Sequence, residues 1–156
     1  VHNTLTVNGE KHQVKGAVPI LATYTKDARL GASLDMTSLF GSNLKKATRE
    51  VVLVKERYLQ VTDQVQAAGQ PASVRWTMVT RAIPTVEGNR IVLQGASKKL
   101  YLKVTSQNNA KVTLKTWSTV GESYDASNAG YYEAGFEAKV TSGQTDTFTV
   151  TLSPNE

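Results

Sequence analysis

The sequence has 156 residues, of which 40% are hydrophobic and 20% charged, with no cysteine and a formal net charge of +5. This length suits one domain with a buried core, and the composition excludes an intrinsically disordered chain. The lack of cysteine excludes disulfides, thiolate catalysis and cysteine-ligated zinc, and no apolar run approaches the ~20 residues of a membrane span.

Alternation of apolar and polar residues predicts strands through most of the chain. In the first of them, Leu5 and Val7 alternate with Thr4 and Thr6. Such alternation gives one buried and one solvated face, which is typical of antiparallel sheets. The predicted strands, in chain order, cover residues 2–9, 48–54, 57–65, 74–82, 100–104, 111–117, 134–140 and 146–152.

Turn signals separate these strands, and only one window favours a helix. The turns are predicted at Asn8-Gly9 and at residues 69–71, 87–89, 95–97 and 142–143. In "LDMTSLFGSNLKKA", Asp35 can cap a helical turn that Gly41 ends. We therefore expect an all-β fold over residues 1–156. It should be an antiparallel two-sheet β-sandwich of about ten or more strands, with at most one short helical turn.

A carboxylate occupies an inward position of one predicted strand. Asp63 shares the register of Leu59, Val61 and Val65, where an unpaired charge would cost several kcal/mol. Arg49, in the preceding strand, is its natural partner. The two residues therefore predict a structural ion pair, with a role in a site as the alternative.

Catalytic motifs are not found in this sequence. Its two histidines, His2 and His12, have neither the HExxH nor the HxH spacing, and neither a GxSxG elbow nor a phosphate-binding glycine loop is present. His12 fits a surface position. His2 is either a strand-end imidazole bonded to backbone, or a metal ligand or acid–base group whose partners lie outside this sequence.

Aromatic residues gather near a polar segment, residues 118–135, which is rich in Gly, Ser and Asn. Trp117 is off-register from Val112 and Leu114, so we expect it to be exposed, whereas Trp76 follows a buried register. Exposed aromatic rings can stack on sugars, and the alternative is that they cover a sheet edge. The candidate carbohydrate-binding residues are Trp117, Tyr124, Tyr131 and Tyr132.

The positive charge favours an acidic partner. Either nucleic acid or an acidic polysaccharide would suit a net charge of +5, although lysine and arginine can also simply solvate the outer faces of strands. Because the charges are spread along the chain, with no block longer than "LKK" or "SKKL", a nucleic-acid-binding arm is disfavoured.

The order of several motifs resembles that of heparinase II/III-like polysaccharide lyases of the Bacteroidetes type. "HNTLTVNGEKHQ" is similar to a strand of that family, and "REVVLVKERYLQVTDQV" to the two strands that follow it. The resemblance continues through "VRWTMVTRAIPTVEGNRIVLQGASKKLYLKV" to "WSTVGESYDASNAGYYEAGFEAKV" and "TDTFTVTLSP".

The resemblance implies that this chain is the C-terminal β-sandwich part of a larger lyase, preceded by an α/α toroid and further β strands. The parent would cleave a uronic-acid polysaccharide by β-elimination, in the periplasm or after secretion. The family's catalytic Asn, Tyr and His lie in segments outside this sequence, so we expect the chain alone to be inactive. His2 matches a histidine that helps to bind zinc in some members, with its co-ligands supplied from upstream. The metal site would therefore be incomplete here.

A second hypothesis belongs to a different class of protein. The chain could be an independent carbohydrate-binding or adhesion-type β-sandwich module that uses Trp117 and the tyrosines as a sugar platform. Binding of a glycan by the isolated chain would favour this hypothesis over the lyase fragment.

Overall fold

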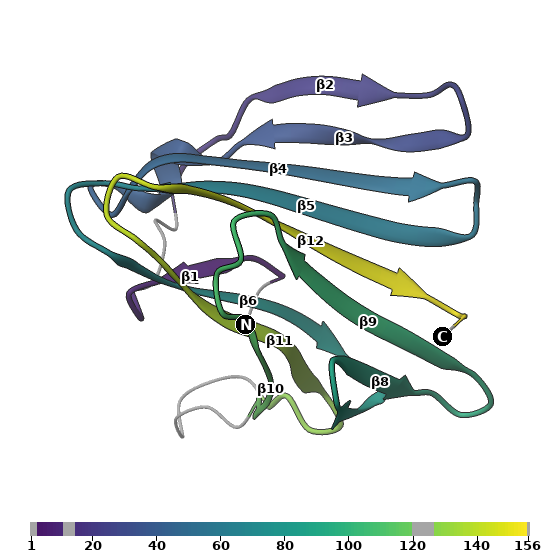
Figure 1. Ribbon diagram of the computed structural model, residues 1–156. Helices are drawn as coiled ribbons and strands as arrows, with labels where there is room; N and C mark the ends of the chain where they lie inside the picture. The colour runs from purple at the N-terminus through teal and green to yellow at the C-terminus, as the bar shows by residue number, and fades with distance from the viewer. Residues whose placement is uncertain (1–2, 11–14, 120–126, 156) are drawn as a thin grey trace.

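The computed structural model describes residues 3–10, 15–119 and 127–155 (Figure 1). These residues form two antiparallel sheets and one 3₁₀ turn, so the predicted all-β sandwich is confirmed. None of the described segments is a helix with the length and hydropathy of a membrane span. The elements are β1 (Leu5–Val7), β2 (Ile20–Tyr24), β3 (Arg29–Asp35), η1 (Thr37–Phe40), β4 (Leu44–Val54), β5 (Tyr58–Ala67), β6 (Ala72–Thr80), β7 (Ile83–Glu87), β8 (Arg90–Gln94), β9 (Lys99–Ser106), β10 (Thr113–Ser118), β11 (Tyr132–Val140) and β12 (Thr145–Ser153).

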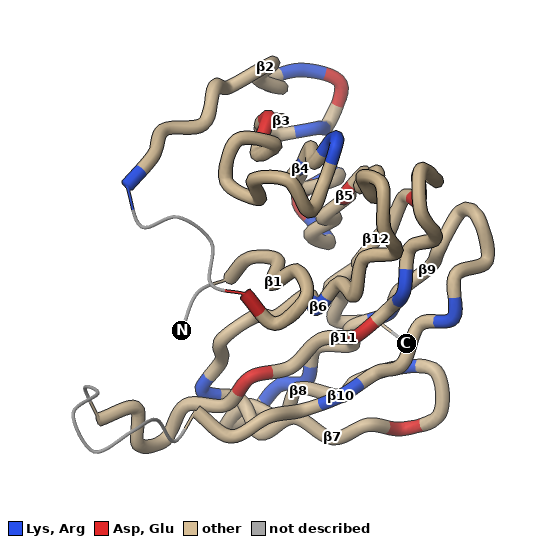
Figure 2. The backbone as a smooth tube through the Cα atoms, turned by 90° about the vertical axis from the view of Figure 1, so that its left-hand side faces the viewer, with Lys and Arg blue, Asp and Glu red and all other residues tan. Residues whose placement is uncertain are grey.

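The two sheets differ in width. The large sheet has eight strands in the order β2-β3-β4-β5-β12-β9-β8-β7, and the small sheet has four in the order β1-β6-β11-β10. In Figure 2 the small sheet lies below β2–β5 of the large sheet, which continues through β12, β9 and β8 to β7 at the bottom of the view. Edge strands β7 and β10 contact each other across the two sheets. The two sheets therefore meet at the β7–β10 end of the sandwich, and among the described residues they are not joined in this way at the β2–β3 end.

Aromatic side chains from both sheets fill the core. Phe136 of β11 stacks on Trp76 of β6 with ring centroids 6.1 Å apart, and its other neighbour is Phe148 of β12, at 5.2 Å. Phe136 and Phe148 are fully buried and Trp76 is 3% exposed, so Trp76 lies in the core, as its register predicts. Burying a side chain of this size stabilises the fold by roughly 1.5–3 kcal/mol.

The predicted helical window forms one 3₁₀ turn, η1. The carboxylate of Asp35 accepts a hydrogen bond of 3.0 Å from the backbone N–H of Thr37, the first residue of the turn. Gly41 follows the last residue with a φ of 55°, a left-handed conformation that glycine adopts at little cost. The N-cap residue itself is Met36, so Asp35 contacts the start of the turn from one position earlier than expected, and Gly41 follows its end as expected.

The first hairpin turn also follows its sequence signal. Asn8 and Gly9 both have positive φ, 54° and 72°, as a type I′ turn requires. The backbone N–H of Glu10 donates to the carbonyl of Val7 at 3.0 Å and closes the turn. The Asn8 side chain accepts a hydrogen bond from the backbone N–H of Ser73, which ties the turn to the start of β6.

Candidate functional site

Arg49 and Asp63 form an ion pair between β4 and β5, inside the sandwich. The guanidinium donates from Nε to Oδ1 at 2.7 Å and from Nη2 to Oδ2 at 2.8 Å, a bidentate geometry. Asp63 is fully buried and Arg49 is 8% exposed. A third donor, Nη1, reaches the backbone carbonyl of Asn3 at 3.0 Å. The pair therefore connects the large sheet to the segment that leads into β1 of the small sheet.

The environment of Asp63 explains why this carboxylate needs a partner. Burial raises its pKa, because the charged form loses its water, while the hydrogen bonds from Arg49 act in the opposite direction. The Arg49 guanidinium also lies 6.0 Å from the centroid of the Trp76 ring. Asp63, Arg49 and Trp76 are all buried, which is the arrangement of a structural pair.

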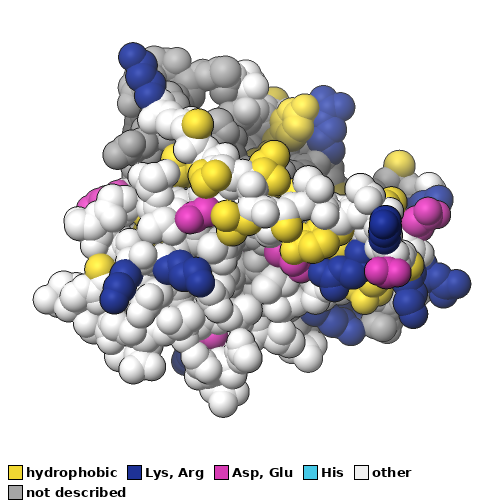
Figure 3. Space-filling view, turned by 90° about the horizontal axis from the view of Figure 1, so that it is seen from above, with side chains coloured by type: hydrophobic (Ala, Val, Ile, Leu, Met, Phe, Trp, Pro, Cys, Tyr) yellow, Lys and Arg dark blue, Asp and Glu magenta, His cyan; other side chains and the backbone are white. Residues whose placement is uncertain are grey.

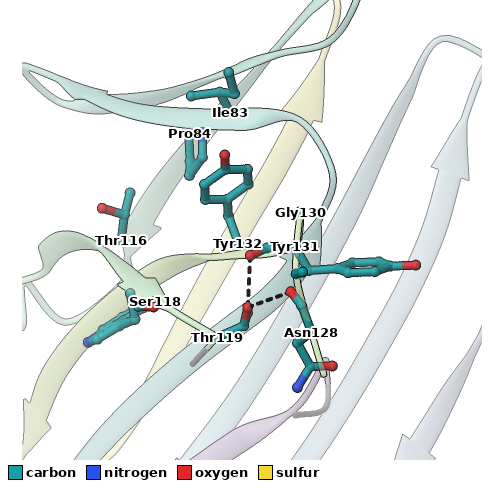
Figure 4. Close-up of a pocket in the computed structure, with 11 residues that line it drawn as sticks. Ile83, Pro84, Thr116, Ser118, Thr119, Asn128, Gly130, Tyr131 and Tyr132 are labelled. Carbon is teal, nitrogen blue, oxygen red and sulfur yellow. Dashed lines mark hydrogen bonds between the residues drawn. The ribbon is translucent and has the colours of Figure 1, made fainter. Parts of the chain in front are cut away.

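A pocket of about 500 Å³ lies where β7 and β10 meet, and Figure 4 shows it closely. This volume falls in the range of small-molecule sites. The side chain of Tyr132 points up toward Pro84 and Ile83, whereas that of Tyr131 points away. Ile83, Tyr131 and Tyr132 are exposed by 55%, 38% and 36%. The lining residues are Ile83, Pro84, Thr116, Trp117, Ser118, Thr119, Asn128, Ala129, Gly130, Tyr131 and Tyr132.

Thr119 holds one wall of this pocket in place. Its buried hydroxyl lies 2.8 Å from the carbonyl oxygen of Tyr131 and 3.1 Å from that of Asn128 (Figure 4). The pocket thus combines apolar surface with hydroxyl and amide groups, a mixture that suits a sugar ring. Sequence reasoning missed Ile83 and Pro84, because only the contact between two edge strands brings them near the tyrosines. It also missed Thr119, which lies in the polar segment but is identified only by its hydrogen bonds.

Trp117 is half-buried and lies on the outward face of the small sheet, with Arg75 and Glu137. The Arg75 guanidinium lies 4.8 Å from the centroid of the Trp117 ring and pairs with Glu137 at 2.9 Å. Lys115 donates to the other oxygen of Glu137. Alternation along β11 places Tyr132 in the inward register, with Ala134 and Phe136. Trp117 and Tyr132 therefore do not share one flat platform.

The ring of Tyr131 contacts a different arginine, Arg81. The guanidinium of Arg81 lies 4.9 Å from the centroid of the Tyr131 ring, a cation–π distance. The predicted aromatic residues in the described part of the chain therefore all border the pocket, but their rings have different neighbours. Trp117 lies under Arg75, Tyr131 lies against Arg81, and Tyr132 points toward β7.

The charge cluster on the outward face predicts a pH dependence of stability. Hydrogen bonding by Lys115, aided by Arg75, lowers the pKa of Glu137. A carboxylate with a lowered pKa stabilises the fold above its unfolded-state pKa, and this contribution is lost as pH falls through the folded value. Replacing Glu137 with Gln should therefore reduce the free energy of unfolding at pH 7 by at most about 1 kcal/mol, since the group is partly exposed.

Urea denaturation at several pH values measures this effect. The difference in free energy of unfolding between the wild type and Glu137→Gln should narrow as the pH falls from about 5 to about 3, a range that begins above the usual glutamate pKa of about 4.3 and ends below it. A gap of constant size over that range would show that the charge of Glu137 does not contribute.

Three residues singled out in the sequence lie outside the described residues: His2, His12 and Tyr124. Within residues 3–10, 15–119 and 127–155, no group of three or more His, Cys, Asp or Glu side chains is arranged to hold a metal ion.

The sequence matches no family model and no curated protein. Among solved structures, heparinase III matches over 97% of this chain and 23% of its own, with a TM-score of 0.71 and 15% identity. Heparan sulfate lyase HepC from Pedobacter heparinus matches over 97% of this chain and 24% of its own, with a TM-score of 0.69 and 17% identity. The chain thus spans about a quarter of the length of these structures. The resemblance seen in the motifs is confirmed for the fold, and the chain has the β-sandwich fold of the matching part of heparinase III and HepC.

Proposed function

We propose that this chain is a non-catalytic β-sandwich part, at the C-terminal end, of a heparinase II/III-like lyase. The observation that carries the proposal is the fold match, which covers 97% of this chain but only 23% of heparinase III. The parent would cleave a uronic-acid polysaccharide by β-elimination, and the other partner of this chain would be the rest of that polypeptide, including an α/α toroid. The net charge of +5 suits an acidic glycan.

The buried carboxylates of the described residues support a structural role. β-Elimination needs a base at the carbon next to the uronate carboxylate, an acid for the leaving sugar and stabilisation of the enolate. Asp63 is paired with Arg49. Asp146 accepts hydrogen bonds from the Ser106 hydroxyl at 2.8 Å and from the backbone N–H of Asn108 at 3.2 Å. These carboxylates stabilise the fold, and the proposal assigns the acid–base groups to the rest of the parent.

Zinc and localisation are further parts of this proposal. His2 would contribute one ligand to a zinc site of the parent, with the other ligands from upstream, since structural and catalytic zinc sites use three or four protein ligands. Because His2 lies outside the described residues, the proposed function does not depend on zinc. A polysaccharide too large to enter a cell would place the parent in the periplasm or outside the cell.

An activity assay tests the proposal. The isolated chain should release no unsaturated uronate from heparan sulfate, chondroitin or alginate, whereas the longer polypeptide encoded by the same gene should release it from one of them. Absorbance of the unsaturated uronate measures the product. Robust product formation by the isolated chain would overturn the non-catalytic assignment.

The pocket favours a second candidate, an independent glycan-binding module. Tyr132 offers an exposed ring beside Thr116 and Asn128, where a sugar could stack and form hydrogen bonds. Isothermal titration of the isolated chain with neutral and acidic glycans should then show binding that Tyr132→Ala abolishes. Tyr24→Ala is the matched control, because Tyr24 lies in β2, at the opposite edge of the large sheet from β7, and does not line this pocket. Equal binding by the wild type and Tyr132→Ala would exclude this pocket.

A further inference from the structure

The core-facing side of the large sheet is exposed at β2 and β3. Leu30 pairs with Leu53, and Leu34 with Arg49, so Leu30 and Leu34 lie on the same face as the buried Arg49–Asp63 pair. Leu34 packs against the core, but Leu30 is 45% exposed. In β2, Ile20 pairs with Leu34 on this face and is 64% exposed. The inward face therefore continues beyond the part that is buried.

The outer edge of the large sheet at β2 is also unprotected by charge. Edge strands usually carry a lysine, a proline or a very short length that discourages pairing with another strand. Within the described part of the chain, β7 contains Pro84, β10 contains Lys115 and β1 has three residues, whereas β2 reads "ILATY". The bulge between Ile20 and Ala22 interrupts β2 only at its start.

Figure 3 looks down on this end of the molecule and shows hydrophobic side chains in a band across its middle. Ile20, Leu21 and Leu30 are three of the most exposed large hydrophobic residues of the described chain, at 64%, 57% and 45%. We call these three residues the β2–β3 patch. Ile20 pairs with Leu34 near the end of β3 and Leu30 lies near its start, so the patch extends along the length of the β2–β3 hairpin. Extended exposed apolar surface on a folded domain marks an interaction surface.

We infer that the β2–β3 patch is the surface on which the rest of the longer polypeptide packs, through an extended segment with apolar side chains. This inference rests on the proposed function. Because the chain spans only 23% of heparinase III, about three quarters of such a polypeptide would lie outside it. A segment that continues the layer of the small sheet would cover Ile20 and Leu30, and the uncharged edge of β2 can pair with it through backbone hydrogen bonds.

A comparison of two leucine variants in two chain lengths tests the inference. Leu30→Lys changes a side chain in the patch, and Leu100→Lys changes a control in β9 that is 42% exposed. In the isolated chain, both variants should shift the Tm by about 2 °C or less. In the longer polypeptide, Leu30→Lys should lower the Tm of the β-sandwich by about 5 °C or more, since the lysine would be buried, and Leu100→Lys should behave as before.

Hydrogen exchange provides a second measurement. The amides of β2 that point away from β3 should exchange quickly in the isolated chain and become protected in the longer polypeptide. Equal exchange in both chains, or equal effects of Leu30→Lys in both, would overturn the inference. Sedimentation tests whether a second copy of the polypeptide occupies the patch instead. A dimer of the longer polypeptide that Leu30→Lys dissociates would assign the patch to that second copy and would also overturn the inference.

The lyase assay distinguishes failure of this inference from failure of the proposed function. Protection of β2 in a longer polypeptide that releases no unsaturated uronate would support the packing surface and contradict the lyase. Release of unsaturated uronate with β2 unprotected would support the lyase and contradict the packing surface.

Discussion

Asp63→Asn is expected to lower the free energy of unfolding by about 3–5 kcal/mol, the usual cost of removing one partner of a buried ion pair. The asparagine fills the same space, but it leaves the Arg49 guanidinium, which is only 8% exposed, without a counter-charge. Urea denaturation measures the loss as a lower midpoint with an unchanged slope, because the surface exposed on unfolding stays the same.

Two further variants show whether the loss of stability comes from the unpaired buried charge. Glu50→Gln is the matched control, because it breaks the partly exposed pair between Arg29 and Glu50 and should cost less than about 1 kcal/mol. The double variant Arg49→Met with Asp63→Leu should recover most of the loss, since an apolar pair of similar volume avoids the buried charge. An Asp63→Asn effect as small as that of Glu50→Gln would contradict the structural role.

Simple alternation predicted the strands that have one face in the core and one in water. Asp63 is an example, because its inward register in the sequence predicted both its burial and its need for Arg49 as a partner. Alternation failed for four strands, β2, β3, β7 and β8. Ile91, Val92 and Leu93 of β8 are all buried, so both of its faces are apolar, whereas β2 is exposed along nearly its whole length. Neither pattern has a period of two.

The candidate site was only partly predictable. The polar segment that follows Trp117 drew attention to Tyr131 and Tyr132, and both border the pocket. Local sequence could not show that Trp117 lies under Arg75 on the outward face, or that Ile83 and Pro84 form the opposite wall. These arrangements depend on pairing between strands far apart in the chain, which no local pattern records.

The pairing of β6 with β11 depends on a glycine that the sequence pattern does not single out. Gly135 pairs with Thr77, and a Cβ at this position would lie 1.9 Å from the carbonyl oxygen of Trp76 and 3.1 Å from its ring. Backbone atoms of a neighbouring strand cannot move aside as a flexible side chain can. Gly135 also lies one row from both Arg75 and Trp117 on the outward face, which leaves the space that the guanidinium crosses to reach the indole.

Gly135→Ala is therefore expected to destabilise the fold by about 3 kcal/mol, the upper part of the usual range for overpacking a core. Separation of β6 from β11 would disturb the stack of Trp76 on Phe136, so a thermal melt followed by tryptophan fluorescence should show a lower Tm. Gly69→Ala is the matched control. Its new methyl group would meet no atom within 4 Å, so this variant should be neutral or more stable by about 0.4–1 kcal/mol through the unfolded chain. Equal stability of the two variants would mean that β6 and β11 can separate at Gly135 without cost, and that close backbone approach does not hold the small sheet together.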